Sequence, residues 1–419
     1  MCALSFDDFL QANAPERNEY MRIEDFINKE KRRLCSGCMA CKDACPTSSI
    51  HLETFDDGFI YPVVNPDTCV NCNKCLNVCP VHTINKNNER QVLYSGVAKD
   101  IVKVFAASSG GVFGAIAEKL IEEGYYVCGA AWDSGMNLNH TLISTVEELN
   151  RLLKSKYVQS NIEGIYTRIN ALLRDGKKVF FVGTPCQVSA LKNYTNNHEN
   201  LLTADIICHG VPSQRMFNDY ISYLNYINGG KVIDFSFRVK NNKFKHAHGY
   251  RYTYEKNGKH KTVEGIYSDS PYYYAFKTYM IFRESCYECK YATTNRVGDI
   301  TLGDFWSIEK YDPKANSDIG VSLVISNSER GSEAIRKIDS VSFREYPLSY
   351  GIETNYSLSK VTKRPDTYDE IMEFYKENGF EKTAIKYFSR GKSLKYRIYW
   401  KIPASIRNSI RKMRGKINV

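Results

Sequence analysis

The chain has 419 residues, 43% of them hydrophobic, so it is long enough for two or three domains with cores of their own. It contains no uninterrupted apolar run of about 18 residues, which argues against a transmembrane helix. The formal net charge is +10, but twelve Lys or Arg residues lie in 382–419, which leaves the rest of the chain near −2. The basic character therefore belongs to a C-terminal tail and says little about the remainder.

The cysteine content points to metal or redox chemistry. The first residues show neither the basic nor the apolar segment of a secretory signal, so we expect a cytoplasmic protein. In that compartment, 14 cysteines indicate metal binding or redox work rather than disulfides.

The predicted elements fall into four parts in chain order. Residues 1–30 look like a polar helical arm. Residues 31–90 carry eight cysteines, with a hairpin predicted around Asp-Asp-Gly. Residues 91–345 alternate helices and strands, then become β-rich from 231 with a hairpin at Asn-Gly, which predicts an α/β core with a mixed sheet. Residues 346–419 read as a helical extension that ends in the basic tail. The predicted fold class is thus α+β or α/β: a ferredoxin-type domain, an α/β core and a helical extension.

Two cysteine motifs with the same spacing lie within residues 31–90. Residues 35–46 read CSGCMACKDACP and residues 69–80 read CVNCNKCLNVCP. Both follow the bacterial ferredoxin pattern, in which the fourth cysteine of each motif binds the cluster of the other. The sequence therefore predicts two 4Fe-4S clusters, one on Cys35, Cys38, Cys41 and Cys79 and one on Cys69, Cys72, Cys75 and Cys45. Zinc is the main alternative, but two four-cysteine runs with a trailing proline fit tetrahedral zinc poorly.

Four of the other cysteines are candidate ligands for a third cluster. Cys186 follows a predicted strand and begins a helix that Thr184 can cap, and Cys208 ends the next strand. Strand ends of this kind gather at the edge of an open α/β sheet where ligands bind. With the C-x2-C pair Cys286 and Cys289 they supply four ligands. A catalytic or redox-active thiol and ordinary packing are the alternatives.

A glycine-rich segment is a candidate anion site. Four small residues precede a predicted helix: Ser108, Ser109, Gly110 and Gly111. Such residues let backbone amides approach an anion at the helix N-terminus. Lys156 can pair with a phosphate or a flavin carbonyl, and Tyr157 can stack on a ring. An ordinary helix cap and a solvated helix end are the alternatives. Iron–sulfur clusters carry single electrons and most metabolites take two, which favours a flavin here.

The chain resembles the coenzyme F-420 hydrogenase/dehydrogenase beta subunit family over about residues 31–345. The shared segments, in order, are the ferredoxin block, SSGGV, SKYVQS, VGTPCQV, CHGVPS, FSFRVK and CYECKYATTNRVGDITLGDFW. The resemblance implies a core that binds FAD near Ser108, Ser109, Gly110, Gly111, Lys156 and Tyr157. It also implies a core 4Fe-4S cluster on Cys186, Cys208, Cys286 and Cys289. Four further residues match family positions without an assigned role: Arg238, Arg296, Asp299 and Asp304.

Two hypotheses of function follow. The first is an iron–sulfur flavoprotein oxidoreductase that links its clusters through FAD to a small-molecule two-electron substrate. The second is a non-catalytic electron-transfer subunit that docks on a redox partner protein, as in a deazaflavin-linked complex. Some members of the family that this chain resembles bind the deazaflavin coenzyme. His209 and Tyr157 are candidate proton donors, and no catalytic residue is assigned.

The C-terminal part suggests a setting and a second kind of contact. It resembles that of bacterial members found near surface-polysaccharide biosynthesis genes, which suggests a role in that pathway. The tail after residue 385 interleaves aromatic and basic residues, which suits a solvated helix end, a protein partner or peripheral contact with an anionic membrane. No nucleic acid partner is expected.

Overall fold

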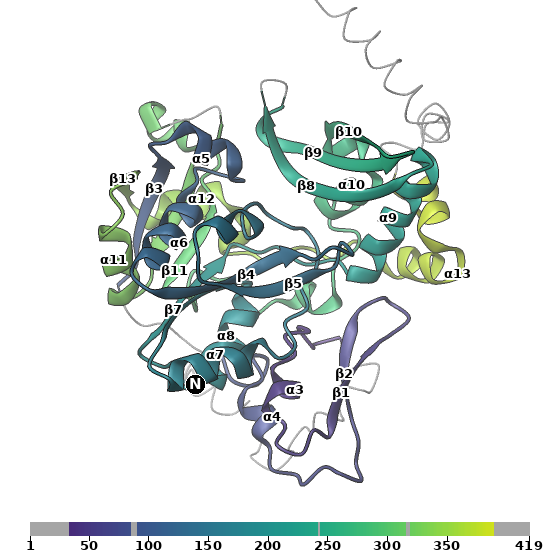
Figure 1. The fold of residues 1–419 in the computed structure, drawn as a ribbon, viewed down its shortest axis with the longest axis horizontal. Helices are drawn as coiled ribbons and strands as arrows, with labels where there is room; N and C mark the ends of the chain where they lie inside the picture. The colour runs from purple at the N-terminus through teal and green to yellow at the C-terminus, as the bar shows by residue number, and fades with distance from the viewer. Residues whose placement is uncertain (1–32, 85–89, 242–243, 316–318, 389–419) are drawn as a thin grey trace, which may run out of the picture.

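The computed structural model describes residues 33–84, 90–241, 244–315 and 319–388, arranged as in Figure 1. The predicted N-terminal arm and most of the basic tail lie outside the described residues. Within the described part, no helix is long and apolar enough to cross a membrane. The fold is α+β, as predicted, with one small two-stranded sheet, one three-stranded sheet and one eight-stranded mixed sheet.

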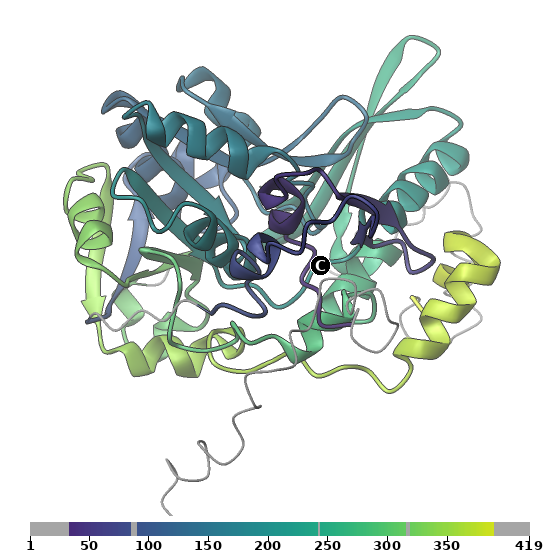
Figure 2. The ribbon, with the colours of Figure 1, turned by 90° about the horizontal axis from the view of Figure 1, so that it is seen from below.

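The cysteine-rich region folds around a short hairpin. Strands β1 (Ile50–Thr54) and β2 (Ile60–Val64) pair antiparallel, and the turn between them contains Gly58 with φ of 80°, as the Asp-Asp-Gly pattern predicted. Two short helices, α3 (Ala40–Ala44) and α4 (Lys74–Asn77), lie beside the hairpin. Seen from below in Figure 2, this purple region lies across the middle of the molecule.

The eight-stranded sheet runs in the order β13-β3-β12-β11-β7-β6-β4-β5. Pairing is parallel only between the four neighbours β11, β7, β6 and β4, and it is antiparallel elsewhere. The alternation of helices and strands predicted this parallel centre. The strands are β3 (Val92–Ala98), β4 (Tyr125–Trp132), β5 (Leu138–Ile143), β6 (Lys178–Gly183), β7 (Leu201–Ile206), β11 (Ile300–Asp304), β12 (Ser322–Ser326) and β13 (Val341–Tyr346).

Helices cover both faces of this sheet. Apolar residues of α6 (Val112–Glu122) and α11 (Glu329–Arg336) share one core cluster with β4 and β12. A second cluster joins α7 (Ile165–Arg174) and α8 (Pro185–Tyr194) to the other side of β4 and β6. This second cluster also includes Cys38, Met39, Ala40 and Val78 of the cysteine-rich region. The ferredoxin-type region is therefore packed into the core of the molecule and is not a separate appendage.

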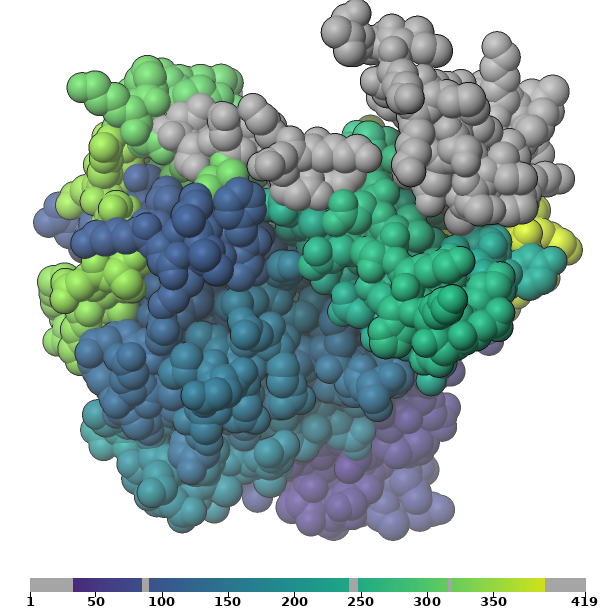
Figure 3. All heavy atoms as spheres, turned by 45° about the horizontal axis from the view of Figure 1, so that its top comes forward, coloured from purple at the N-terminus to yellow at the C-terminus, as the bar shows by residue number. Residues whose placement is uncertain are grey.

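A three-stranded antiparallel sheet forms a second lobe, shown in green beside the blue lobe of α5 (Ile101–Ala106) and α6 in Figure 3. Asn257 and Gly258, both with positive φ, form its hairpin turn, as the Asn-Gly pattern predicted. Aromatic side chains such as Phe217, Phe235 and Tyr272 contact one another edge to face and fill the space against the helices. The elements are α9 (Gln214–Asn228), β8 (Lys231–Asn241), β9 (Phe244–Lys256), β10 (Lys259–Ile266), α10 (Pro271–Lys277) and α13 (Tyr368–Lys386).

One expected helix is replaced by an irregular segment. The pattern of residues 145–155 predicts a helix, but the structure has only the short 3₁₀ helix η2 (Glu147–Arg151). Lys154 takes a left-handed conformation, with φ of 68°, which ends any helix there. The following residues run as an extended segment into the centre of the molecule, where Tyr272 donates a hydrogen bond to the Tyr157 carbonyl at 2.8 Å. Tertiary contacts have overridden local helix propensity.

Candidate iron–sulfur and flavin sites

The eight cysteines of the ferredoxin-type region line two cavities. The inner quartet of Cys35, Cys38, Cys41 and Cys79 lines one cavity. The outer quartet of Cys45, Cys69, Cys72 and Cys75 lines the other. Each cavity thus holds three cysteines of one motif and the fourth of the other, which is the crossed grouping expected from the sequence.

Matching backbone turns shape the two cavities. Gly37 and Asn71, the third residues of the two motifs, have φ of 66° and 51°. Met39 and Asn73, each just before a helix, have φ of 63° and 58°. These left-handed residues curl each motif so that its thiols face inward, and the helix that follows carries its last cysteines to the cavities. The repeated spacing in the sequence thus produces a repeated local fold.

Burial of these thiols opposes their ionisation unless a bound cation stabilises the thiolate forms. Burial, followed by the neighbouring Cys35 thiol, raises the pKa of Cys79 to about 11. Burial and the surrounding thiols also raise the pKa values of Cys38 and Cys41 well above their usual range. Thiolates gathered in this way repel one another, and bound iron supplies the positive charge that stabilises them. The donor set therefore fits a thiolate-ligated cluster.

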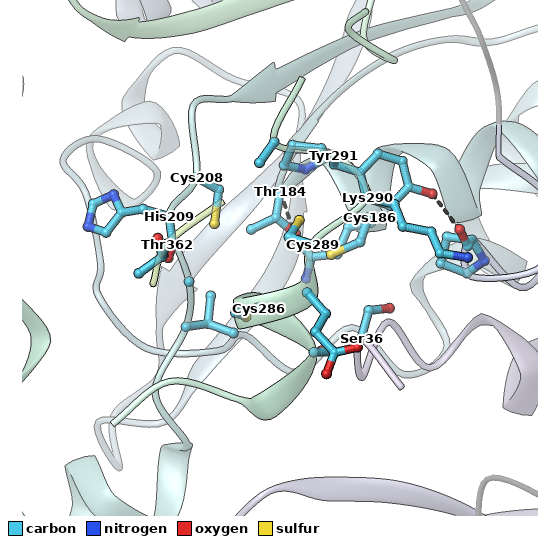
Figure 4. A pocket seen from close by; sticks show the side chains of 18 of the residues that line it. Ser36, Thr184, Cys186, Cys208, His209, Cys286, Cys289, Lys290, Tyr291 and Thr362 are labelled. Carbon is cyan, nitrogen blue, oxygen red and sulfur yellow. Dashed lines mark hydrogen bonds between the residues drawn. The ribbon is translucent and has the colours of Figure 1, made fainter. Parts of the chain in front are cut away.

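The four candidate ligands of the core line a third cavity (Figure 4). Cys186 lies in the first turn of α8, where the predicted Thr184 cap forms a capping box with Gln187. Cys208 follows the neighbouring parallel strand β7, while Cys286 lies in the 3₁₀ helix η4 (Glu284–Glu288) and Cys289 directly after it. Two adjacent strand ends and one distant loop thus supply this core quartet.

The electrostatics of the core cavity resemble those of the other two. Burial raises the pKa of Cys208 to about 12, and the neighbouring Cys186 thiol adds to the rise. Burial likewise raises the pKa of Cys186 to about 11, against the hydrogen bond between its sulfur and Thr184 Oγ1 at 3.2 Å. The C-terminal part of the chain closes this cavity, because Lys360 and Thr362 are among its lining residues.

The glycine-rich segment lies beside a concentration of buried cations. The Ser108 carbonyl accepts a hydrogen bond from Arg238 Nη2 at 2.9 Å, and the Ser109 carbonyl accepts one from Lys240 Nζ. Gly111 caps α6 with φ of 88°. Gly110 has a structural role, because a Cβ atom there would lie 2.1 Å from the Gly96 carbonyl. Its N–H donates to Ser322 Oγ at 2.9 Å, so that amide is already paired.

Arg238 is the most constrained of these cations. It lies at a β-bulge of β8, with φ of 58°, and pairs with both carboxylate oxygens of Asp304 at 2.7 and 2.9 Å. A bulge redirects a side chain away from the regular pleat, and backbone strain of this kind is concentrated at functional sites. The Nε atom of Arg238 is buried without a hydrogen-bond partner. Arg238 and Asp304, which both match family positions, therefore form an ion pair. The Nε–H group of Arg238 remains available to donate a further hydrogen bond.

Two lysines nearby are poised to change charge near neutral pH. Burial and the adjacent Lys154 lower the pKa of Lys156 to about 7, and its Nζ donates to the carbonyl of Leu153 at 2.8 Å. Burial and Arg238 lower the pKa of Lys240 to about 7. An anion bound beside these amines would favour their charged forms. This fits a phosphate group, as the sequence suggested for Lys156.

Tyr157 and His209 lie in an aromatic wall between the core cavity and these cations. The Tyr157 ring stacks on Phe276 at 4.0 Å between centroids, which covers one of its faces, and its hydroxyl accepts from Arg238 Nη1 at 3.4 Å. The His209 ring lies 5.1 Å from the same Phe276 ring. Burial, with Lys277 and Arg238, lowers the pKa of His209 to about 4, so its ring is neutral at pH 7. Of the two candidate proton donors, only Tyr157 directly contacts the cations.

The other two family-matched residues belong to a buried network behind the core cavity. Arg296 donates to Asp205 Oδ1 at 2.7 Å and to the Ile206 carbonyl at 3.1 Å. Asp299 accepts from both the backbone N–H and the hydroxyl of Thr203. These bonds fix the end of β7, from which Cys208 projects. Arg296 and Asp299 therefore hold the scaffold of the site.

Sequence reasoning named Gln159 as part of the SKYVQS segment but missed three other residues at these sites: Arg283, Lys240 and Thr362. These residues contact the candidate ligands, their neighbours or the glycine-rich segment from distant parts of the chain. None of the three has a sequence spacing that marks its role. The only signal for Arg283 is its place three residues before Cys286.

The fold and site define an iron–sulfur protein, and comparison with known proteins agrees. Residues 176–345 match the family model that describes the C-terminal part of the beta subunit of coenzyme F420 hydrogenase/dehydrogenase. Residues 34–83 and 61–109 match models of the 4Fe-4S dicluster domain. The chain therefore combines a 4Fe-4S dicluster domain with a domain of the kind that forms the C-terminal part of the coenzyme F420 hydrogenase/dehydrogenase beta subunit, as the motifs predicted.

Two curated relatives named as ferredoxin-type proteins match a short part of the chain. A ferredoxin-type protein NapF from Haemophilus influenzae is 37% identical over 13% of this chain and 31% of its own length. A polyferredoxin-like protein from Methanocaldococcus jannaschii is 34% identical over 12% of this chain and 35% of its own length. The chain thus spans about a third of the length of these two relatives.

One solved structure shows a weak likeness over a larger part of the chain. A chain of the F420-reducing [NiFe] hydrogenase complex from Methanosarcina barkeri is 17% identical, with a TM-score of 0.39. The likeness covers 71% of this chain and 90% of that one. A TM-score this low does not by itself establish a shared fold.

Proposed function

We propose that the chain is an iron–sulfur flavoprotein oxidoreductase that passes electrons between three 4Fe-4S clusters and a two-electron substrate through FAD. The observation that carries this proposal is the presence of three cavities, each lined by four cysteines, next to one another. The inner and core cavities share the lining residues Ser36 and Val81. The inner and outer quartets meet in one apolar cluster that contains Cys41, Cys45 and Cys75. Clusters in such a row supply one-electron transfer.

The cation group beyond the aromatic wall supports FAD binding. Bound FAD would supply the exchange between single electrons and electron pairs. Arg238, Lys156 and Lys240 provide positive charge for its phosphates. Phe276 contacts both Tyr157 and His209, so an apolar wall separates this group from the core quartet and keeps water away. The glycine-rich segment would contact the phosphates. The Gly110 amide would not take part, because it already donates a hydrogen bond to Ser322.

The outer quartet supports a protein partner at the other end of the row. Cys72 is exposed, and the neighbouring Val70 is 62% exposed. Clusters exchange electrons with other proteins most readily where they lie close to the surface. This observation also favours the second candidate function, a subunit that only transfers electrons to or from a partner enzyme. The basic tail lies mostly outside the described part of the chain. Its expected role and the expected link to polysaccharide biosynthesis stay predictions.

Iron and flavin content per chain, after strictly anaerobic purification, tests the proposal. Three 4Fe-4S clusters give about twelve iron atoms and two give about eight. About twelve irons with one FAD is the expected result. About eight irons with no flavin after reconstitution would overturn the core cluster and the flavin. About twelve irons, one FAD and no turnover of two-electron acceptors without a partner protein would favour the second function.

A further inference from the structure

Arg283 is a fully buried cation that bridges the core and the ferredoxin-type region. It lies three residues before Cys286, and its backbone N–H donates to the Val211 carbonyl of the core at 2.9 Å. Its guanidinium extends into the other region, where Nη1 donates to the Cys35 carbonyl at 3.1 Å and Nη2 to the Ile60 carbonyl at 2.7 Å. The side chain is 0% exposed. One residue thus joins the segments that carry members of the core and inner quartets.

Gln159 completes this contact from the core side. Its Oε1 accepts from Arg283 Nε at 3.0 Å, while its Nε2 donates to the carbonyls of Ser36 at 3.0 Å and Gly37 at 3.3 Å. Together with the bond to Cys35, three successive carbonyls of the inner quartet's loop accept hydrogen bonds from two core side chains. The fit is close, because a Cβ atom on Gly37 would lie 2.6 Å from Arg283 Nη2.

These bonds set the direction of the amide dipoles in the loop. In a trans peptide the N–H points opposite to the C=O. Carbonyls drawn toward Arg283 and Gln159 therefore turn the following amides, those of Ser36, Gly37 and Cys38, toward the opposite side of the loop. Within the described residues none of these three amides donates to a protein acceptor. All three residues line the cavity of the inner quartet.

The positive charge of Arg283 has no carboxylate to neutralise it directly. No ion pair to this side chain occurs among the residues that the structure describes. Its guanidinium instead lies over the rings of Phe59 at 4.7 Å and Tyr61 at 4.4 Å. A buried cation without a counter-charge is costly. Asp57 acts on this charge from a distance, and the Cys35 and Cys286 thiols, one from the inner and one from the core quartet, are the other acidic groups in position to offset it.

We propose that Arg283, held by Gln159, is a positioning residue that raises the reduction potential of a cluster bound by the inner quartet. A nearby cation and N–H groups directed at cluster sulfurs both stabilise the reduced, more negative state, and so raise its potential. The proposal rests on the proposed function, since it requires a cluster in this cavity. The proposal adds a buried cation that distinguishes the inner cluster site from the more exposed outer one.

Redox titration of the full-length, anaerobically purified chain, followed by electron paramagnetic resonance, tests the proposal. Arg283→Gln should lower the midpoint potential of the inner cluster most, with a smaller downward shift for the core cluster, and leave the outer cluster unchanged. Arg283→Lys keeps the charge but loses the planar fork, so it should give a smaller downward shift. Gln159→Met removes the two donors to Ser36 and Gly37 and should shift the inner cluster downward. This variant and Arg283→Lys keep the test decisive if Arg283→Gln does not fold.

Arg364→Gln is the matched control. Arg364 is 35% exposed and binds Glu284, in the same 3₁₀ helix as Cys286, at 3.0 Å, without touching the inner quartet's loop. It should leave all potentials unchanged. Unchanged potentials in the folded Arg283 and Gln159 variants, at full iron content, would overturn this proposal and leave the proposed function intact. Wild-type protein without iron after reconstitution would instead count against the clusters themselves.

Discussion

Thr362 Oγ1 donates a hydrogen bond of 2.7 Å to the backbone carbonyl of His209, 153 residues earlier in the chain. The bond ties the C-terminal part to the residue next to Cys208. Thr362 and Lys360 both line the core cavity. The helical extension, expected from the sequence to lie outside the core, thus contributes part of the wall of a candidate cluster site.

Thr362→Val should loosen this closure. Loss of one hydrogen bond to a buried carbonyl lowers the free energy of unfolding by about 1 kcal/mol. A chelator should then bleach the core cluster faster than the two ferredoxin clusters, as followed by visible absorbance. Thr354→Val is the control, because Thr354 makes an equivalent 2.8 Å bond to the Tyr350 carbonyl within α12 (Leu348–Thr354). Equal bleaching rates in both variants would contradict the closing role.

Cys186→Ser should remove the core cluster alone. Iron content should fall from about twelve to about eight atoms per chain, with the spectrum of the ferredoxin clusters retained. Cys128→Ser provides a matched control, since Cys128 is a buried thiol in β4 that lines none of the three cavities. Full iron content in the Cys186 variant would show that the core quartet does not hold a cluster.

Anion binding at the cation group should weaken as pH rises through about 7. The pKa values of Lys156 and Lys240 are lowered to about 7 from an ordinary 10.5, mainly by burial. Without a ligand, these lysines lose their protons more readily in the folded state than in the unfolded state. Their contribution to the free energy of unfolding therefore becomes more favourable as pH rises from 7 to 10.5. A bound phosphate reverses this preference and requires the charged forms. Affinity should fall by up to roughly tenfold per lysine between about pH 7 and 8.

Calorimetric titration of the flavin-free protein with FAD, or with pyrophosphate, measures this dependence. Lys156→Met and Lys240→Met should each flatten the pH profile and weaken binding at about pH 6, where both amines of the wild-type protein are charged. Lys119→Met is the control, because Lys119 is a solvent-exposed partner of Glu123 on the same helix, α6. An affinity that does not change with pH in the wild-type protein would show that the phosphates bind elsewhere.

Asp205→Asn should strongly destabilise the fold. The Asp205 carboxylate is 0% exposed and accepts from Arg296 Nη2 at 2.7 Å, Gly298 N at 2.8 Å and Thr301 Oγ1 at 2.9 Å. Removal of its charge leaves a buried guanidinium without a counter-ion, which costs about 3–5 kcal/mol. Chemical denaturation should show the loss, while Asp312→Asn, at an exposed pair with Arg344, should change little. A small effect for Asp205 would show that Arg296 finds other partners.

Local sequence patterns predicted a large part of this architecture. The two cysteine motifs, the Thr184 cap, the Asn-Gly hairpin and the parallel central strands all depend on residues within one or two elements. The grouping of the core quartet also followed, because adjacent parallel strands bring their carboxyl ends together. What failed was the helix at 145–155, where tertiary contacts of the Tyr157 segment decide the conformation.

The unpredicted parts arise from contacts across long sequence separations. The antiparallel pairing of β3 with β12 and β13 joins residues more than 200 positions apart, such as Leu93 and Ile325. Arg283 reaches Cys35 over a separation of 248 residues. A lone arginine or threonine has no spacing that marks such a role, so only the folded chain shows which backbone groups it satisfies.

The closure of the core cavity by Thr362 has a consequence for how the protein is made. The ferredoxin motifs leave the ribosome first, and the hairpin and two short helices around them are local in sequence. The four core cysteines follow in three separate segments, and their cavity gains its last wall only when Thr362 has been translated. Iron–sulfur assembly factors would therefore have access to all four core cysteines only after Cys289 has been translated, and that access would end as the C-terminal part docks.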